Sequence, residues 1–252
     1  MLLVISPAKK LNENCLLKYD LSLSKPNCLN ESKILVSTLK KYSPKALQKL
    51  MNVSQNIARL NYDRYSKWKT PFNKKNSYPA ILLFEGDVYK GINANNFDKS
   101  DFNFAQKHLR ILSGLYGILK PLDLIQPYRL EMGTSIKIKK FNNLYEFWGD
   151  KITDKINNDN KNKPLINLAS NEYFKSINES YIKGEVINII FKEKKGNNYK
   201  VIGILAKKAR GIMSRYIIKN KIKDPERLKK FSLDSYRFNK TLSTEQDWVF
   251  TR

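Results

Sequence analysis

Histidine and cysteine are scarce in this 252-residue sequence, which contains one histidine, His108, and two cysteines, Cys15 and Cys28. A single histidine excludes a HExxH zinc site and the paired carboxylate-histidine motifs of di-iron proteins, since each needs two histidines. The cysteines show neither CxxC spacing nor a disulfide framework, which predicts a reducing compartment. We therefore expect no resident metal and no cofactor.

Long apolar runs and glycine-rich nucleotide loops are also missing. No segment approaches the roughly 18 apolar residues that a membrane-spanning helix needs. The start, MLLVISPAKKLN, turns polar too early for a signal peptide. Neither GxxxxGKS/T nor GxGxxG occurs. These absences predict a cytoplasmic protein without a membrane partner. Phosphoryl transfer or hydrolysis with a carboxylate-held metal stays open, although surface carboxylates far outnumber metal ligands; the candidates are Asp87, Glu131, Asp150 and Glu172.

Acidic residues are few relative to basic ones. The sequence has 23 Asp and Glu against 47 Lys and Arg, so its net charge is +24. A charge of this size attracts polyanions, of which nucleic acid is the usual partner and an anionic membrane surface the second. Part of the lysine surplus is typical of a Lys-, Asn- and Ile-rich composition and indicates solvated surface. The nine arginines are more informative, because a guanidinium grips phosphate at two points.

The order of apolar strands, polar turns and helices predicts an α/β (α+β) fold, with a mixed central sheet flanked by helices in one domain over residues 1–252. The expected strands are residues 2–5, 80–84, 164–168, 184–191 and 199–205. The expected helices are residues 31–41, 44–59, 97–112 and 141–156, with a last one that follows residues 206–211 and ends near residue 221.

Two of the expected strands end in polar residues that could bind an anion. Ser6 and Lys9 follow the first strand, and Ser170 and Glu172 follow the strand at 164–168. Ligands of α/β sheets bind outside the carboxyl ends of the strands, and a hydroxyl with an ammonium can grip a phosphate. A capped turn and an ordinary helix cap explain the same residues without any ligand.

The third expected strand end carries the strongest signal in the sequence. Lys207, Lys208 and Arg210 cluster at a predicted strand-to-helix junction, and Arg215 follows about one helical turn later. Four cations this close repel one another, so they are tolerable on a solvated edge and favourable only beside an anion. The cluster therefore indicates an anion site.

A glycine bend offers a further contact with nucleic acid. Gly114 and Gly117 separate two apolar segments, with Arg110, Lys120 and Arg129 on the flanks. A helix-hairpin-helix element presents backbone N–H groups to a DNA phosphate at such a bend, without reading the sequence. An ordinary glycine turn between core helices explains the spacing equally well.

These features leave two functions open. The leading one is a binding protein that grips DNA phosphates with little base readout. The alternative is an enzyme acting on a nucleotide or on damaged nucleic acid, in a pocket on which Ser6, Lys9, Tyr116, Glu172 and Lys207 would converge. Direct sequestration of iron is disfavoured, because the sequence supplies few good iron ligands.

Several long segments resemble the YaaA family of bacterial peroxide-stress proteins. They are LLVISPAKKLN, FEGDVYKG, FNFAQKHLRILSGLYGILKPLDLIQPYRLEMG, LYEFWGDKI, INLASNEYFKSI and AKKARGIMSRYII. The resemblance implies a role in survival of hydrogen peroxide and in limiting free iron. It also implies sequence-independent binding of double-stranded or branched DNA, an unusual α/β fold and a helix-hairpin-helix, which would fall at residues 112–119. The implied basic cleft would contain Lys9, Lys207, Lys208 and Arg210.

Overall fold

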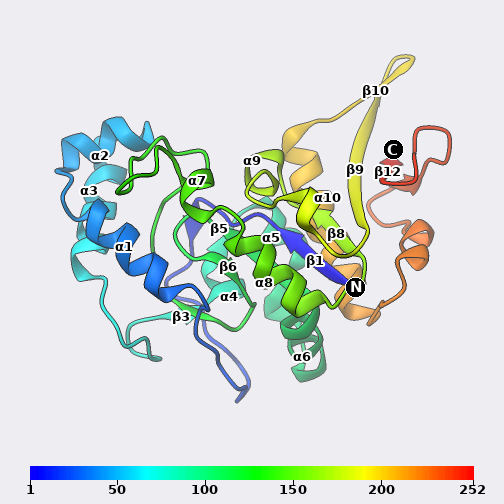
Figure 1. The fold of residues 1–252 in the computed structure, drawn as a ribbon. Coiled ribbons are helices and arrows are strands. Elements are labelled where there is room, and N and C mark those ends of the chain that lie inside the picture. Colours follow the sequence, from blue (N-terminus) through cyan, green and yellow to red (C-terminus); the bar gives the residue numbers. More distant parts are fainter.

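The computed structural model describes residues 1–252, and its centre is a mixed sheet (Figure 1). The strands follow the order β11-β12-β9-β8-β1-β5-β6, and β10 pairs with β9 outside this row. The neighbours from β12 to β5 run parallel, while β11 and β6 pair antiparallel at the two edges. The bounds are β1 Leu2–Ile5, β5 Leu109–Ser113, β6 Gly117–Leu119, β8 Leu165–Leu168, β9 Val186–Lys195, β10 Asn198–Lys200, β11 Arg237–Phe238 and β12 Asp247–Thr251. The predicted α/β class with a mixed sheet is confirmed.

The parallel strands at the centre are apolar because both of their faces are covered. Every residue of β1 and β5 is buried, and β8 is buried except at Asn167. Parallel strands with helices on both sides read as continuous apolar runs for this reason. The polar residue inside β8 is therefore unusual for its position.

Helices lie on both sides of the sheet, with α8 in front of the strands and α6 behind them in Figure 1. α5, α6 and α10 pack on one another, and α10 also contacts β9. The bounds are α4 Ala80–Leu83, α5 Asp87–Ile92, α6 Lys99–His108, α7 Leu144–Trp148, α8 Lys151–Asn160, α9 Asn171–Phe174 and α10 Gly203–Lys219. Three short 3₁₀ helices complete this part, η1 Ala94–Asn96, η2 Glu179–Tyr181 and η3 Pro225–Lys230.

The remaining helices stand beside the sheet, on the left of Figure 1, and include a helical hairpin. They are α1 Leu29–Leu39, α2 Pro44–Met51 and α3 Gln55–Lys67. Asn52 ends α2 in the left-handed conformation, and Ser54 accepts the N–H of Ile57 to begin α3. Two small antiparallel pairs tie the connecting segments together, β2 Lys10–Leu11 with β4 Phe84–Glu85, and β3 Tyr78–Pro79 with β7 Leu124–Ile125.

The helix-hairpin-helix expected at residues 112–119 is not formed there. β5 and β6 pair antiparallel, and Ser113 faces Gly117 across a tight turn, so the segment is a β-hairpin. β5 also pairs with β1 at the centre of the sheet, and this pairing satisfies the backbone of an apolar segment that reads equally well as helix. Consequently the helix expected over 97–112 stops at His108.

Other expectations about local structure were also wrong. The helix expected over 44–59 is divided into α2 and α3, and the helix expected over 141–156 is divided into α7 and α8. Ala80–Leu83 forms one helical turn between two short strands where a strand was expected. The strand expected over 199–205 ends at Lys200, and α10 begins at Gly203. The basic cluster of residues 207–210 therefore lies inside a helix and not at a strand end.

Candidate functional site at the strand ends

The carboxyl ends of β1 and β8 bring two of the predicted polar segments together. Ile5 pairs with Leu168, so the residues that follow them meet at the same edge of the sheet. Ser6 Oγ accepts the N–H of Ser170 at 2.8 Å and donates to Ser170 Oγ at 3.2 Å. Tyr89 on α5 donates its hydroxyl to the carbonyl of Ser6 at 3.1 Å. The adjacent strand ends therefore form one hydrogen-bonded unit.

Charged side chains surround this unit and are neutralised within it. Glu131 pairs with Lys9 at 2.9 Å and with Arg129 at 3.0 Å. Glu172 accepts the N–H of Gly133 at 3.0 Å. Two of the predicted phosphate-binding cations thus share one carboxylate, and the segment around Glu131 is fastened to the end of β8.

Three tyrosines, Tyr89, Tyr128 and Tyr173, lie buried next to these carboxylates. Burial raises the pKa of each phenol, and the neighbouring tyrosines and carboxylates raise the pKa of Tyr173 further. The phenols are therefore neutral at physiological pH. They act as fixed hydrogen-bonding groups and not as nucleophiles.

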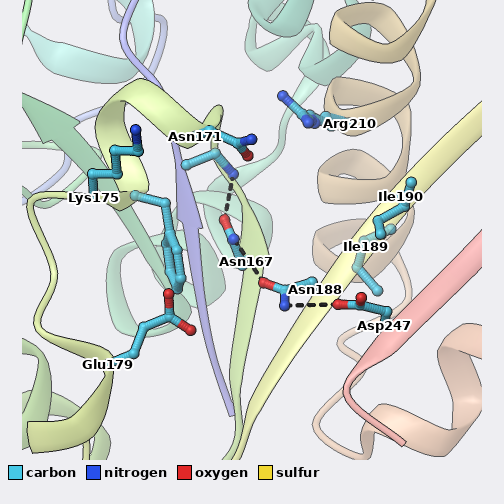
Figure 2. A pocket seen from close by; sticks show the side chains of 11 residues that line it. Asn167, Asn171, Lys175, Glu179, Asn188, Ile189, Ile190, Arg210 and Asp247 are labelled. Atoms are coloured by element: carbon cyan, nitrogen blue, oxygen red, sulfur yellow. Dashed lines mark hydrogen bonds between the residues drawn. The ribbon is translucent and has the colours of Figure 1, made fainter. Parts of the chain in front are cut away.

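A polar pocket of about 320 Å³ opens beside this unit, between the sheet and α10 (Figure 2). It draws its walls from β8, α9, β9, α10 and β12. The residues that line it are Asn167, Ala169, Asn171, Phe174, Lys175, Glu179, Asn188, Ile189, Ile190, Arg210 and Asp247. The strand ends therefore supply a concave site in addition to the charged cluster.

The floor of the pocket is a ladder of polar side chains across three parallel strands. Asn167, Asn188 and Asp247 are register partners on β8, β9 and β12. Asn167 accepts the N–H of Ala169 at 2.9 Å and donates its amide to Asn188 at 2.8 Å. Asn188 donates in turn to Asp247 at 2.9 Å (Figure 2). A backbone donor at one end and a carboxylate at the other fix the orientation of both amides.

Arg210 is the one cation of the predicted basic cluster that reaches this pocket. Its guanidinium makes no hydrogen bond and no ion pair within the protein, and its Nε is fully buried without a partner. Burial lowers the pKa of the guanidinium, since the charge is held away from water. The site therefore contains a cation that has no direct partner in the protein.

The other two residues of that cluster point to solvent from α10. Lys207 and Lys208 are exposed, and Lys208 lies 3.5 Å from Asp234. Arg215 turns the other way and donates to the carbonyls of Ile92 and Asn93 at 3.0 and 2.9 Å. Arg215 therefore caps the carboxyl end of α5 and is occupied by the fold.

Arg110 and Lys120 are also tied to the fold. Arg110 is buried, pairs with Asp159 at 2.7 Å and donates to two backbone carbonyls. Lys120 lies 3.9 Å from the same carboxylate and is half-buried. Arg110 at least is held inside the protein, where a duplex cannot reach it.

The glycines and the tyrosine of the β5–β6 hairpin belong to the core. A Cβ on Gly114 would lie 2.3 Å from the carbonyl oxygen of Leu130, and Gly117 has φ +67°. Tyr116 is buried, accepts the indole N–H of Trp68 and donates to the carbonyl of Gln126. The hydroxyl of Tyr116 is therefore engaged within the core and makes no hydrogen bond to Ser6 or Glu172.

Sequence reasoning missed the ladder, although a signal was present. Asn167 and Asn188 each interrupt an otherwise apolar strand, in LINL and VINII, and Asp247 begins DWVFT. A polar residue in a covered strand needs a partner, because an unpaired buried amide is costly. The spacing does not reveal that the three strands are neighbours in matching register.

Together these features define an α/β protein with a cation-bearing polar pocket beside the carboxyl end of β8 in a mostly parallel sheet. A family model described as "Peroxide stress protein YaaA" matches residues 1–242. UPF0246 proteins of Teredinibacter turnerae and Saccharophagus degradans are 49% and 50% identical, over 100% of this chain and 99% of theirs. A UPF0246 protein of Neisseria meningitidis serogroup B is 47% identical, over 100% and 98%.

The chain therefore belongs to the YaaA family of peroxide stress proteins, as the resemblance predicted. Two further observations concern membrane-spanning proteins and metal-binding proteins. No helix has the length and apolar character needed to cross a bilayer. No group of three or more His, Cys, Asp or Glu side chains is placed to hold a metal ion.

Proposed function

We propose that this peroxide stress protein binds double-stranded or branched DNA through its phosphates, largely independently of sequence, and so helps to limit iron-dependent oxidative damage. The observation that carries the proposal is the number of free cations. Only thirteen of the 47 basic side chains pair with a carboxylate. The others have no carboxylate partner, and those of them that are exposed are available to replace the counterions of a polyanion.

Two elements present such cations on projecting surfaces. The β9–β10 hairpin extends away from the body of the protein in Figure 1 and carries exposed Lys194, Lys195 and Lys200. Lys207 follows on the exposed face of α10, next to Lys208, which is also exposed although it lies 3.5 Å from Asp234. Cations on a projecting hairpin and on the adjacent helix can reach phosphates on both sides of a groove.

The α2–α3 hairpin offers a contact of a different kind. Its helices are joined through Asn52 in the left-handed conformation. The first turn of α3 leaves backbone N–H groups without helical partners, of which Ser54 accepts that of Ile57. Lys45 and Lys49 are exposed on α2 beside it. We place here the phosphate contact that the sequence suggested for residues 112–119.

The salt dependence of DNA binding tests the proposal. Six to ten phosphate contacts should lose roughly 10³–10⁵ in affinity between about 50 and 200 mM salt. The double variant Lys207→Ala with Lys208→Ala should weaken binding to unrelated duplexes equally and reduce the slope against log salt by about two. Affinity is measured by fluorescence anisotropy on two duplexes of different sequence and on a four-way junction.

A double variant with the same net charge serves as the control. Lys99 and Lys107 are exposed on α6, which lies at the opposite end of the molecule from the β9–β10 hairpin in Figure 1, so Lys99→Ala with Lys107→Ala should bind DNA nearly as the wild type does. A salt-independent affinity, or equal losses in the two double variants, would contradict phosphate binding at this surface.

Catalysis is the second candidate function, and one observation favours it. Ser6 and Ser170 are hydrogen-bonded at the strand ends, with Lys9, Glu131 and Glu172 around them. Such a cluster is more elaborate than a grip on the DNA backbone requires. Turnover of a nucleotide or of damaged DNA that is lost in Ser6→Ala would support an enzyme, and binding without turnover would leave the first function.

A further inference from the structure

We propose that the pocket between the sheet and α10 binds one nucleoside monophosphate unit, with its phosphate on Arg210 and a sugar hydroxyl on Asp247. This site is distinct from the surface proposed to grip the DNA backbone, and it adds a small-ligand activity to the protein. The fold leaves Arg210 and one oxygen of Asp247 without partners in the pocket, and their arrangement indicates the ligand.

Arg210 lacks an anionic partner within the protein. The lining of the pocket contains two carboxylates, yet neither lies within ion-pair distance of the guanidinium, and no protein atom accepts a hydrogen bond from it. Buried charges in proteins are normally paired, because leaving one alone costs stability. Arg210 is half-buried on the long helix α10, and its Nε lies out of contact with water. A ligand anion would complete the missing partnership.

The ladder explains why Asp247 does not neutralise Arg210. Asp247 is held on β12 by the amide of Asn188 at Oδ1, and its Oδ2 has no partner. Each asparagine amide also keeps one N–H that the ladder does not use, because each donates a single bond along it. The floor of the pocket therefore offers two donors and one charged acceptor in a fixed order, with Arg210 above them (Figure 2).

These groups fit a phosphate ester of a sugar better than a simple anion. Arg210 suits a phosphate, and the exposed Lys175 at the rim supplies a second cation for its second charge. A bare phosphate would be repelled by Asp247, whereas a hydroxyl can donate to Oδ2. Dinucleotide-binding proteins likewise use a carboxylate to accept a ribose hydroxyl, although there it lies at the opposite end of a strand from Asp247.

The size and walls of the pocket limit the ligand to one nucleotide. A volume of about 320 Å³ is at the lower end for small-molecule sites, and it excludes a duplex. Phe174, Ile189 and Ile190 supply apolar surface for a sugar or a base. The nucleotide could be a free monophosphate or the 5′-phosphorylated end of a DNA strand, since both present the same chemistry.

Isothermal titration calorimetry on the full chain tests the proposal with three probes: a deoxynucleoside 5′-monophosphate, the matching deoxynucleoside and inorganic phosphate. The monophosphate should bind more tightly than either of the others. Arg210→Gln should weaken its binding at least about ten-fold, because a charge-assisted hydrogen bond is lost. Arg227→Gln, an exposed change with the same loss of charge, should leave it unchanged.

Asp247→Asn separates a nucleotide site from a general anion site. The amide oxygen of asparagine can still accept the bond from Asn188, so the ladder is kept. The monophosphate should bind less tightly to this variant, while inorganic phosphate binds equally well or better. The proposal would be overturned if Asp247→Asn bound the monophosphate more tightly and inorganic phosphate less tightly than the wild type does. It would also be overturned if the wild-type protein bound no monophosphate at millimolar concentration.

Thermal unfolding distinguishes a ligand-binding arginine from a structural one. Arg210 is half-buried and its Nε has no partner, so Arg210→Gln removes a partly desolvated charge, and the melting temperature of the unliganded protein should rise by about 2–4 °C. A fall in melting temperature would show that Arg210 supports the fold, and it would contradict the proposal independently of the calorimetry.

Short single strands with a 5′-phosphate or a 5′-hydroxyl identify the source of the nucleotide. Preference for the phosphorylated strand, abolished by Arg210→Gln, would indicate a DNA end; binding of the monophosphate alone would indicate a free nucleotide. Lys207→Ala with Lys208→Ala should leave monophosphate binding intact. A protein that binds the monophosphate but no duplex would contradict the DNA-binding proposal alone. A protein that binds duplex DNA but no monophosphate would contradict the pocket proposal alone.

Discussion

Arg210 and Arg215 lie five residues apart on α10 but differ in their hydrogen-bond partners. Arg215 donates to two carbonyls at the end of α5 and lies over the ring of Phe97, whereas Arg210 has no partner in the protein. Five residues correspond to about 500° along an α-helix, so the two side chains leave the helix in different directions. The role of each arginine depends on what the rest of the fold places on that side.

Gly211, next to Arg210, sets the distance between α5 and α10. A Cβ at this position would lie 2.0 Å from the carbonyl oxygen of Val88 and 2.9 Å from Cα of Gly91. These are backbone atoms, which cannot move aside as a flexible side chain can. The crossing of the two helices therefore requires glycine, and the position of Arg210 depends on that crossing.

Gly211→Ala should lower the free energy of unfolding by about 1–3 kcal/mol, because the helices must separate to admit the methyl group. Gly203→Ala is the matched control on the same helix, since nothing lies within 4 Å of the new Cβ. The control should be neutral or stabilising, because alanine loses less backbone entropy on folding. Urea denaturation followed by circular dichroism measures both, and equal effects would contradict this account of the crossing.

At the scale of elements, the start of α6 is joined to the end of α10. Asp98 and Asp101 form a capping box at the first turn of α6. Asp101 is buried and also accepts hydrogen bonds from Lys219, at 2.6 Å, and from Lys221. Burial alone would raise the pKa of Asp101, but the lysine hydrogen bonds outweigh it and the pKa is lowered.

This lowered pKa predicts a contribution to acid stability. The stabilisation is present above the ordinary aspartate pKa near 4 and disappears as the pH falls through the lower pKa of the folded protein. Asp101→Asn should therefore be less stable at neutral pH and lose less stability between about pH 4 and pH 2. Asp63→Asn, on the exposed face of α3, is the control and should keep the wild-type acid profile. Denaturation midpoints across this pH range provide the measurement.

At the scale of the whole molecule, the net charge of +24 acts on the fold as well as on partners. Like charges repel one another in the compact state, and salt screens this repulsion over a Debye length of about 10 Å at 0.1 M. The melting temperature should therefore rise between about 20 and 200 mM NaCl, whereas DNA affinity falls over the same range. An equal rise with KCl would show that screening is responsible, and a fall in melting temperature with salt would refute the argument.

The strand-end cluster was foreseen in part, and the reason lies in topology. The buried apolar runs at 2–5 and 164–168 indicate strands, and ends of parallel strands that neighbour each other must meet. Ser6 and Ser170 accordingly touch. The third expected strand end is not formed, because the strand stops at Lys200 and residues 203–205 already belong to α10. This helix packs on α5 and β9. Local propensity does not record such tertiary packing.

Composition and local pattern determined the properties that do not depend on distant contacts. The net charge, the α/β class, the family and the central apolar strands could all be derived from the sequence, because each sums over residues or repeats along a short segment. Tertiary structure alone decided which cations remain free. Arg110 and Arg215 are satisfied by a carboxylate or carbonyls from elsewhere in the chain, and Arg210 is not. A charge is available only where the fold brings no partner, and that depends on residues far apart in sequence.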